Sequence, residues 1–273
     1  MAFVAKGKFF AGVAAALLMT AGAAQAAAQC GNNSAGFPAW VEQFKQQAKS
    51  QGIGSKGLNA LNNLTYASKT ISYDRNQKSF KYSLEKFMQV RGAQAIVARG
   101  KRQKAANAAL FASIEKRYGV PAGPIIAIWG LETGFGAATG NQHTLSAVAT
   151  LAYDCRRSAY FTEQLYAALR LIDKDDLAAD ARGALHGEIG QTQFMPANVL
   201  KYGADGDGSG HIDMVHSKAD ALASTANYLA GHGWQRGAGY QPGQPNFAAI
   251  QEWNAATVYQ QTIAIMGAQI DGN

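Results

Sequence analysis

The sequence holds little charge and few of the side chains that build metal or cofactor sites. Charged residues make up 16% of the 273 positions and hydrophobic residues 48%, a balance that indicates a globular core and not a disordered chain. Its two cysteines and five histidines lack the spacing of a zinc site. A glycine-rich phosphate-binding loop and a serine nucleophile elbow are both missing. These gaps disfavour zinc enzymes, nucleotide-dependent enzymes and serine hydrolases.

Long apolar runs are equally scarce, and the one that is present lies at the N-terminus. A basic start at Lys6 and Lys8 precedes an apolar stretch from Phe9 to Met19, and small residues then allow cleavage near residues 26–28. This order is typical of a secretory signal, and the apolar stretch is too short to span a membrane well. We therefore expect residues 1–28 to be a signal peptide.

The remaining residues, 29–273, contain no linker rich in Pro and Ser and are predicted to form one domain. Cys30 lies close to the cleavage site, but Gln29 before it does not fit a lipobox, so we expect a soluble protein exported to the periplasm. In an oxidising compartment Cys30 and Cys155 are expected to pair. The alternative is two separate buried thiols.

Acidic residues are in deficit, since 18 Asp and Glu stand against 25 Lys and Arg for a formal charge of +7. The charge falls by two when Lys6 and Lys8 leave with the signal peptide. A basic exported protein suits a polyanionic partner such as the cell wall or a membrane surface. No tight cluster of Lys and Arg with interleaved aromatics is present, so nucleic acid is not expected as a partner.

Alternating strand patterns are rare, and the chain is predicted to be a succession of helices joined by glycine-rich loops. The glycine-rich region 183–215 has room for one short hairpin. The main predicted helices span Pro38 to Ala48, Gly57 to Leu64, Ser79 to Val90, Gln103 to Tyr118, Ser146 to Tyr153, Ala159 to Ile172, Ser217 to Ala230 and Ala255 to Ile270.

A further helix carries the most unusual residue of the chain. One of its faces is apolar except for a single carboxylate, at the i, i+3, i+4, i+7 spacing of Ile125, Ile128, Trp129 and Glu132. A carboxylate taken out of water has its pKa raised and can then donate a proton near neutral pH, as cleavage of a glycosidic bond requires. The glycines that follow allow the helix to end in a tight turn beside the acid. The alternative is a core Glu paired with an Arg.

A second segment, Gly187 to Pro196, combines an amide with apolar side chains. Gln193 offers a hydrogen-bond donor and acceptor, while Phe194 and Met195 offer apolar contact for the face of a sugar. On its own this pattern also fits a plain loop that leads into a helix. Glu188 in the same segment is a second carboxylate, either catalytic or a solvated loop acid, and we assign it no role.

With both segments in view, the chain resembles the lytic murein transglycosylases of the membrane-bound type B group, glycoside hydrolase family 103. The resemblance extends from about Phe37 to Ile270. Four ordered segments carry it: Trp-Gly-Leu-Glu-Thr-Gly-Phe-Gly at 129–136, Leu-Ala-Tyr-Asp-Cys-Arg-Arg-Ser-Ala-Tyr-Phe at 151–161, Gly-Glu-Ile-Gly-Gln-Thr-Gln-Phe-Met-Pro at 187–196, and Ala-Ser-Thr-Ala-Asn-Tyr-Leu at 223–229.

The resemblance implies a lysozyme-like fold, mainly α, with a helical catalytic core over residues 29–273 and a small β or loop region. It implies cleavage of the MurNAc-GlcNAc β-1,4 bond of peptidoglycan without water, leaving 1,6-anhydro-MurNAc ends. Glu132 takes the position of the family's single acid/base. Gln193 and Tyr228 take the positions of its cleft glutamine and tyrosine, with Phe194 and Met195 in the same loop.

Two positions depart from the family pattern. Ala184 stands where members often have a Ser before the cleft glutamine, and Phe87 where a Tyr is found upstream of the acid. Both changes remove a hydroxyl group from the expected cleft and leave the reaction type unaltered.

The segment from Asp205 to Asp213 resembles an EF-hand calcium loop. Its oxygen ligands are supplied by Asp205, Asp207, Ser209, the main-chain carbonyl of His211, and Asp213. At position 12, however, His216 replaces the bidentate Glu. Asp220 can reach back instead, as later acids do in calcium-binding members of the family, or it can serve only in a capping box with Ser217.

We expect a monomer that acts on peptidoglycan glycan strands and requires no cofactor for catalysis, with a structural calcium ion left open. The sequence leaves three alternative interpretations open. They are a hydrolytic muramidase of similar fold, a cell-wall-binding protein without activity, and a calcium-stabilised interaction protein.

Overall fold

The computed structural model describes residues 28–76 and 82–272, so the predicted signal peptide lies, except for Ala28, outside the described residues. Within these ranges the regular elements are α-helices, two short 3-10 helices and one two-stranded sheet, joined by loops. The elements are α1 (Phe37–Ser50), α2 (Ser55–Ala60), α3 (Ser68–Arg75), α4 (Leu84–Val90), α5 (Ala93–Ala106), α6 (Ala108–Tyr118), α7 (Ala122–Thr133), β1 (Gln142–His143), α8 (Thr144–Tyr153), α9 (Ser158–Asp173), β2 (Arg182–Gly183), α10 (Pro196–Tyr202), α11 (Lys218–Gly231), α12 (Phe247–Trp253) and α13 (Thr257–Asp271).

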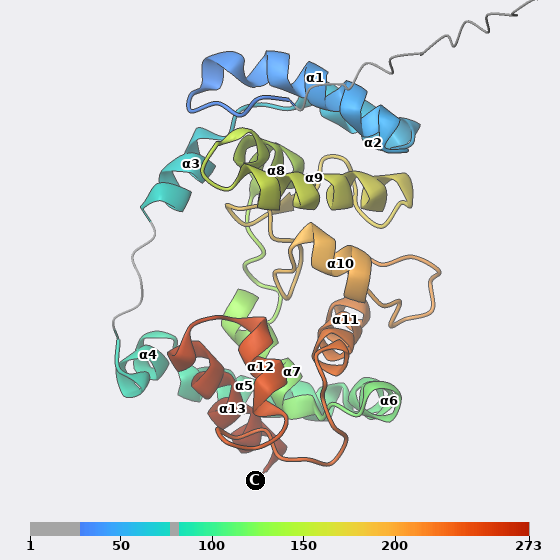
Figure 1. Cartoon of the computed structure of the whole chain (residues 1–273). Helices are drawn as coiled ribbons and strands as arrows, with labels where there is room; N and C mark the ends of the chain where they lie inside the picture. Colours follow the sequence, from blue (N-terminus) through green and yellow to red (C-terminus); the bar gives the residue numbers. More distant parts are fainter. Residues whose placement is uncertain (1–27, 77–81, 273) are drawn as a thin grey trace, which may run out of the picture.

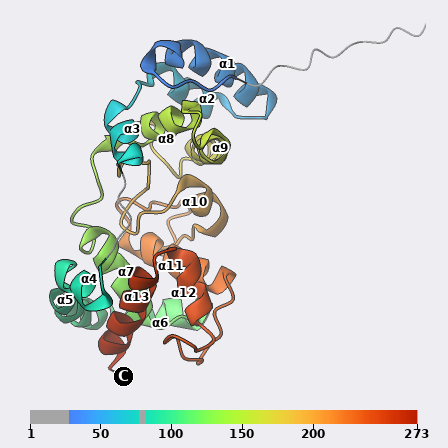
Figure 2. The ribbon, with the colours of Figure 1, turned by 60° about the vertical axis from the view of Figure 1, so that its left-hand side comes forward.

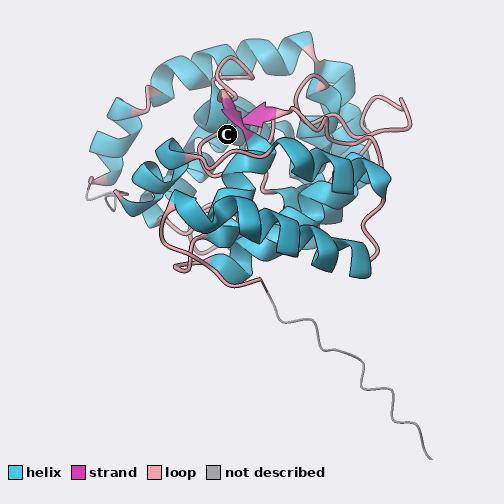
Figure 3. Cartoon of the chain, turned by 90° about the horizontal axis from the view of Figure 1, so that it is seen from above, coloured by secondary structure: helices cyan, strands magenta, loops and turns pink. Residues whose placement is uncertain are grey.

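The helices form two groups stacked along the long axis of the molecule, with α10 between them (Figure 1). One group holds α1, α2, α3, α8 and α9, and the other holds α4 to α7 and α11 to α13, as the turned view in Figure 2 also shows. Contacts of α10 with both α9 and α11 join the groups. Seen from above in Figure 3, the sheet is a small feature among the helices. The predicted fold class, mainly α with a small β region, is confirmed.

Helix α7 is the centre of the second group and packs against α5, α11 and α13. Every one of its residues is buried except Glu132, which is partly exposed. The approach to α13 is close enough that a Cβ on Gly123 would lie 2.2 Å from the carbonyl oxygen of Gly267. Only glycine allows two helix backbones to come this near, so this pair sets the distance between α7 and α13.

The predicted end of α7 is confirmed. Gly134 caps the helix in the left-handed conformation at φ 59°, and its N–H donates to the carbonyl of Gly130. Glycine adopts this conformation without the steric penalty of a Cβ. The chain therefore turns away directly after Glu132, which leaves the carboxyl group at the edge of the packed region.

Several details of the sequence-based prediction are wrong. Within 183–215 the expected hairpin is reduced to one antiparallel bridge between Ile189 and Phe194. The sheet itself pairs β1 with β2, in which Gln142 faces Gly183 across 41 residues of chain, a contact that no local pattern encodes. The helix expected from Gln103 to Tyr118 breaks at Asn107 (φ −123°), which separates α5 from α6. Helices α3 and α12 were not predicted. The first residues of the helix expected from Ser79 lie outside the described residues, and α4 begins at Leu84.

Cys30 and Cys155 form a disulfide, as predicted, across a sequence separation of 125. Beside it the N–H of Gly31 donates to the carbonyl of Tyr153 at 2.9 Å. The bridge therefore ties the start of the described chain to the turn between α8 and α9. Among the helices of the described ranges, none has the length and apolar character needed to cross a membrane.

We expect reduction of the Cys30–Cys155 disulfide to lower the free energy of unfolding by about 2–4 kcal/mol, because the bridge restricts a long loop of the unfolded chain. Thermal unfolding with and without dithiothreitol measures this as a fall in Tm. The double variant Cys30→Ser/Cys155→Ser is the control, and its Tm should match that of the reduced wild type and ignore the reductant. A wild-type Tm that does not respond to dithiothreitol would contradict a stabilising bridge.

Candidate active site

The carboxyl group of Glu132 accepts two hydrogen bonds on the same oxygen. The hydroxyl of Tyr259 donates to Oε1 at 2.7 Å, and the indole Nε1 of Trp253 donates to it at 3.1 Å. In the part of the chain that the structure describes, no Lys or Arg forms an ion pair with Glu132. The core ion pair considered from the sequence is therefore not formed there.

Burial raises the pKa of Glu132 above its ordinary value of 4.5. The hydrogen bonds from Tyr259 and Trp253 and the charge of Arg91 act in the opposite direction, while the charge of Glu188 raises the pKa further. The pKa of Tyr259 is itself raised well above 10 by burial and by the neighbouring Glu132. Tyr259 therefore stays a hydroxyl donor at neutral pH.

Glu132 opens into a cleft of about 420 Å³. All of the residues that the sequence assigned to substrate binding line this cleft together with it: Gln193, Phe194, Met195 and Tyr228. Glu188 lines the same cleft and also the neighbouring cavity, which contains Ala184. The structure thus brings the acid and the predicted binding residues into one cavity, although they come from segments far apart in the sequence.

The loop that carries Gln193 is bonded directly to α7. Trp129 Nε1 donates to Gln191 Oε1 at 3.2 Å, and Thr133 Oγ1 donates to the main-chain carbonyl of Gln191 at 2.6 Å. Gln193 itself sits at φ 55°, a rare conformation for a residue other than glycine, and its Nε2 donates to the carbonyl of Gly190 at 2.8 Å. These contacts hold the amide at a fixed position relative to Glu132.

One wall of the cleft is a cluster of three aromatic rings. The ring centroids of Phe194 and Trp253 lie 5.3 Å apart, and those of Tyr228 and Trp253 lie 5.1 Å apart, both edge to face. The hydroxyl of Tyr228 donates to the carbonyl of Glu252 at 2.7 Å, and burial raises the pKa of Tyr228 to about 12. Tyr228 therefore presents an uncharged ring to the cleft.

Trp253 and Tyr259, the two donors to Glu132, were missed from the sequence. Trp253 ends α12, which was not predicted at all, and Tyr259 lies on the predicted last helix without any local mark of function. Phe87, one of the two departures from the family pattern, packs against Tyr259 with ring centroids 5.8 Å apart. A ring without a hydroxyl group thus supports the tyrosine that holds the acid.

The predicted calcium loop brings three carboxylates together. One carboxylate oxygen from each of Asp205, Asp207 and Asp220 lies within 4.8 Å of the others, and hard oxygen ligands of this kind suit calcium. Asp220 is fully buried, and its two oxygens accept from the N–H groups of Gly206 and Asp213, each at 2.8 Å. Asp220 therefore reaches back into the loop.

The other candidate ligands lie on the outer part of this loop. Ser209 Oγ donates to the carbonyl of His211 at 3.3 Å. His216 Nδ1 is 2.9 Å from Asp213 Oδ2 and so pairs within the loop instead of completing the ligand set. Ser217 Oγ accepts from the N–H of Asp220 at 3.2 Å, which is the predicted cap of α11. The residues present fit a calcium ion held mainly by Asp205, Asp207 and Asp220.

The helical architecture and the buried carboxyl group at its cleft define a protein of the lysozyme-like class. The sequence model of the Transglycosylase SLT domain family matches residues 36–243, and the chain belongs to this family. The resemblance drawn from the four sequence segments is thereby confirmed.

Known proteins of this kind share sequence or fold with the chain. Membrane-bound lytic murein transglycosylase B of Escherichia coli (strain K12) is 38% identical over 138 residues, which is 47% of this chain and 38% of that protein's length. SltB3 of Pseudomonas aeruginosa, solved in complex with NAG-anhNAM-pentapeptide, is 27% identical with a TM-score of 0.81 over 87% of this chain and 80% of its own. A lytic transglycosylase of Escherichia coli in complex with calcium shares the fold at 23% identity, with a TM-score of 0.76 over 89% of this chain and 96% of its own.

We expect Glu132→Gln to stabilise the protein relative to wild type as the pH rises. The folded protein raises the pKa of Glu132, so the stability that its protonated form contributes is complete below the unfolded pKa and is lost as the pH rises through the folded pKa. Gln never ionises, and the gain at pH 8 over pH 4 should be roughly 1 kcal/mol. Denaturant unfolding at both pH values measures it, with Glu42→Gln, exposed on α1, as the control. A Gln variant that is equally destabilised at both pH values would contradict the argument.

Proposed function

We propose that the protein is a peptidoglycan lytic transglycosylase that cleaves the MurNAc-GlcNAc β-1,4 bond without water and leaves 1,6-anhydro-MurNAc ends. The observation that carries the proposal is the environment of Glu132, a carboxyl group mostly removed from water, held by Tyr259 and Trp253, and open to the cleft. The family membership and the relative SltB3, solved with an anhydro-muropeptide, support it as well.

Glu132 serves as acid first and as base second. Its proton passes to the bridging oxygen as the bond from that oxygen to the anomeric carbon of MurNAc breaks, and the electron pair stays on the departing oxygen. The C6 hydroxyl oxygen then bonds to the anomeric carbon while its proton returns to Glu132, which closes the anhydro ring and restores the acid. One carboxyl group can do both because the first step leaves it deprotonated, whereas hydrolytic glycosidases need two.

The two hydrogen bonds to Glu132 suit this sequence of steps. Since Tyr259 and Trp253 both donate to Oε1, the acid proton belongs on Oε2, which is left for the substrate. When the proton has gone, the same two donors stabilise the carboxylate. Gln193 is suited to orient the N-acetyl group of MurNAc, whose carbonyl oxygen stabilises the positive charge at the anomeric carbon, and Phe194, Met195 and Tyr228 are suited to contact the sugar faces.

The second candidate function is a hydrolytic muramidase. The observation that favours it is Glu188, a second carboxylate on the same cleft, because hydrolysis uses a second carboxylate to activate water or the sugar. The products of a muramidase would carry reducing ends heavier by one water than anhydro ends.

We place the protein in the periplasm as a monomer acting on glycan strands, with no cofactor for the reaction and with a structural calcium ion at Asp205, Asp207 and Asp220.

Digestion of purified sacculi tests the reaction. We expect wild type to release muropeptides with anhydro ends by mass spectrometry, and Glu132→Gln to lower their release by roughly 100-fold or more because the only acid is lost. Glu42→Gln is the matched control and should keep the wild-type rate. Reducing ends in place of anhydro ends would favour the muramidase, and undiminished release by Glu132→Gln would sink the proposed mechanism.

Calcium is tested by thermal unfolding in calcium chloride and in EDTA. We expect calcium to raise the Tm, because binding to the folded state alone stabilises it, and Asp205→Ala to abolish that rise. Asp180→Ala removes an exposed carboxylate outside the loop and should keep it. If Asp205→Ala leaves both metal content and the calcium response unchanged, the ion does not bind at this loop.

A further inference from the structure

Glu188 is a second carboxylate of the cleft that the proposed reaction does not use. It lies in the loop between β2 and α10, whereas Glu132 comes from α7, and both side chains line the same cavity. The side chain of Glu188 is 23% exposed. It also lines the adjoining cavity, where Gln193 is again a neighbour. Glu188 thus stands at the junction of the two cavities.

His186 holds the carboxylate of Glu188 with two donors. The main-chain N–H of His186 donates to Oε2 at 3.0 Å, and its ring Nδ1 lies 3.1 Å from Oε1. Burial raises the pKa of Glu188, but the hydrogen bonds and charge of His186 outweigh burial and leave that pKa below its ordinary value. The surroundings of the two carboxyl groups therefore act in opposite directions, since they lower the pKa of Glu188 and raise the pKa of Glu132.

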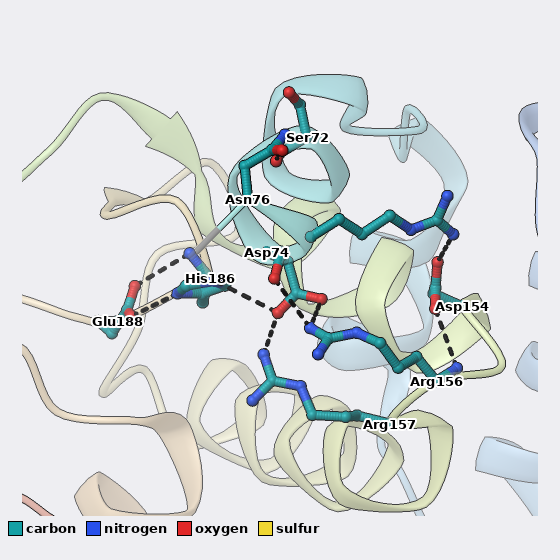
Figure 4. Close-up of polar contacts among 9 residues, drawn as sticks. Ser72, Asp74, Asn76, Asp154, Arg156, Arg157, His186 and Glu188 are labelled. Carbon is teal, nitrogen blue, oxygen red and sulfur yellow. Dashed lines mark hydrogen bonds and ion pairs between the residues drawn. The ribbon is translucent and has the colours of Figure 1, made fainter. Parts of the chain in front are cut away.

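The ring of His186 also faces Asp74, a residue of the group of helices that holds α3. Figure 4 shows His186 between Glu188 and Asp74, a buried residue on α3. The ring Nε2 lies 3.5 Å from Asp74 Oδ1, and Asp74 also pairs with the guanidinium groups of Arg156 and Arg157. Asp74 thus faces the Nε2 edge of the imidazole without a hydrogen bond to it, while Nδ1 on the other side of the ring lies beside Glu188.

We propose that Glu188 is a positioning residue for the reaction, an anion fixed in the cleft that keeps Glu132 in its protonated, acidic form. The idea rests on the proposed function, in which Glu132 must carry a proton before it can act. Enzymes often place two carboxyl groups in one cleft and separate their pKa values by different surroundings. One group then serves as the acid, and the other stays an anion beside it. Here the environments differ because His186 stabilises one charge and burial opposes the other.

Three further groups that can carry charge lie near the two carboxyl groups. Arg91, between α4 and α5, is the cation that lowers the pKa of Glu132, and its guanidinium donates to the carbonyl of Leu131. Tyr160 on α9 lies near Glu188, whose charge adds to the effect of burial in raising the pKa of that phenol. Arg157 lines the cleft but is paired with Asp74. Removal of the Glu188 charge would therefore leave burial alone to oppose Arg91 and the two hydrogen bonds in setting the pKa of Glu132.

A direct titration of Glu132 tests the proposal without any need for activity. Carbon-13 NMR of Glu-labelled protein, with the Glu132 signal assigned by its loss in Glu132→Gln, gives the pKa of Glu132 in each variant. We expect Glu188→Gln to lower that pKa by roughly 0.5 or more and Glu188→Asp, which keeps the charge, to lower it less. Glu188→Ala gives the same readout if the Gln variant does not fold.

Glu252→Gln is the matched control, since Glu252 is an exposed carboxylate on the rim of the same cleft. It should leave the pKa of Glu132 where wild type has it. A folded Glu188→Gln or Glu188→Ala variant with the wild-type pKa of Glu132 would overturn the proposal. An equal fall of the Glu132 pKa in Glu252→Gln would also overturn it, because the fall would then follow from the net charge of the protein and not from the position of Glu188.

The pH profile of anhydro-muropeptide release provides the functional readout. The alkaline limb reports loss of the Glu132 proton, and in Glu188→Gln it should move to lower pH by the same amount as the NMR value. A lower rate with an unmoved limb would mean that Glu188 has a structural role only. If wild type releases reducing ends, the proposed transglycosylase reaction fails while the NMR titration still decides the role of Glu188.

Discussion

The burial of one carboxyl group is the constraint on which the rest of the structure depends. Glu132 lies on α7, a helix whose other residues are all buried, and burial is what raises its pKa. That position exists because α7 and α13 meet at Gly123 and Gly267, which brings Tyr259 from the start of α13 to the acid. Packing between helices thus sets the chemistry of the group at the cleft.

The cleft is built where the two groups of helices meet. Its loop is bonded to α7 through Gln191, and its far side is supplied by α9 and by the network around Asp74. That network and the Cys30–Cys155 disulfide both attach the N-terminal helices to the region around α8 and α9. The first helices therefore support the cleft from outside, although α1 and α2 supply none of the residues that line it.

Two carboxyl groups share this cleft and have opposite tendencies. Glu132 meets hydrogen bonds on one oxygen only and is mostly removed from water, whereas both oxygens of Glu188 meet donors from His186. The same residue type thus acquires two roles from two environments. The difference depends on contacts with α3, α12 and α13, none of which is adjacent in sequence to either acid.

What the sequence by itself determined is local. Three features depend on neighbours within a few residues and could be predicted from the sequence: the apolar stripe with Glu132, the glycine that ends α7 and the cap of α11. The four segments that carry the family resemblance could be recognised from the sequence as well. The pairing of β1 with β2, the break at Asn107 and the helices α3 and α12 could not. Above all, the donors to Glu132 come from Trp253 and Tyr259, 121 and 127 residues away. Only the packing of α13 against α7, and of α12 against α13, decides these two contacts. No periodicity within a helix indicates which distant side chain will face it.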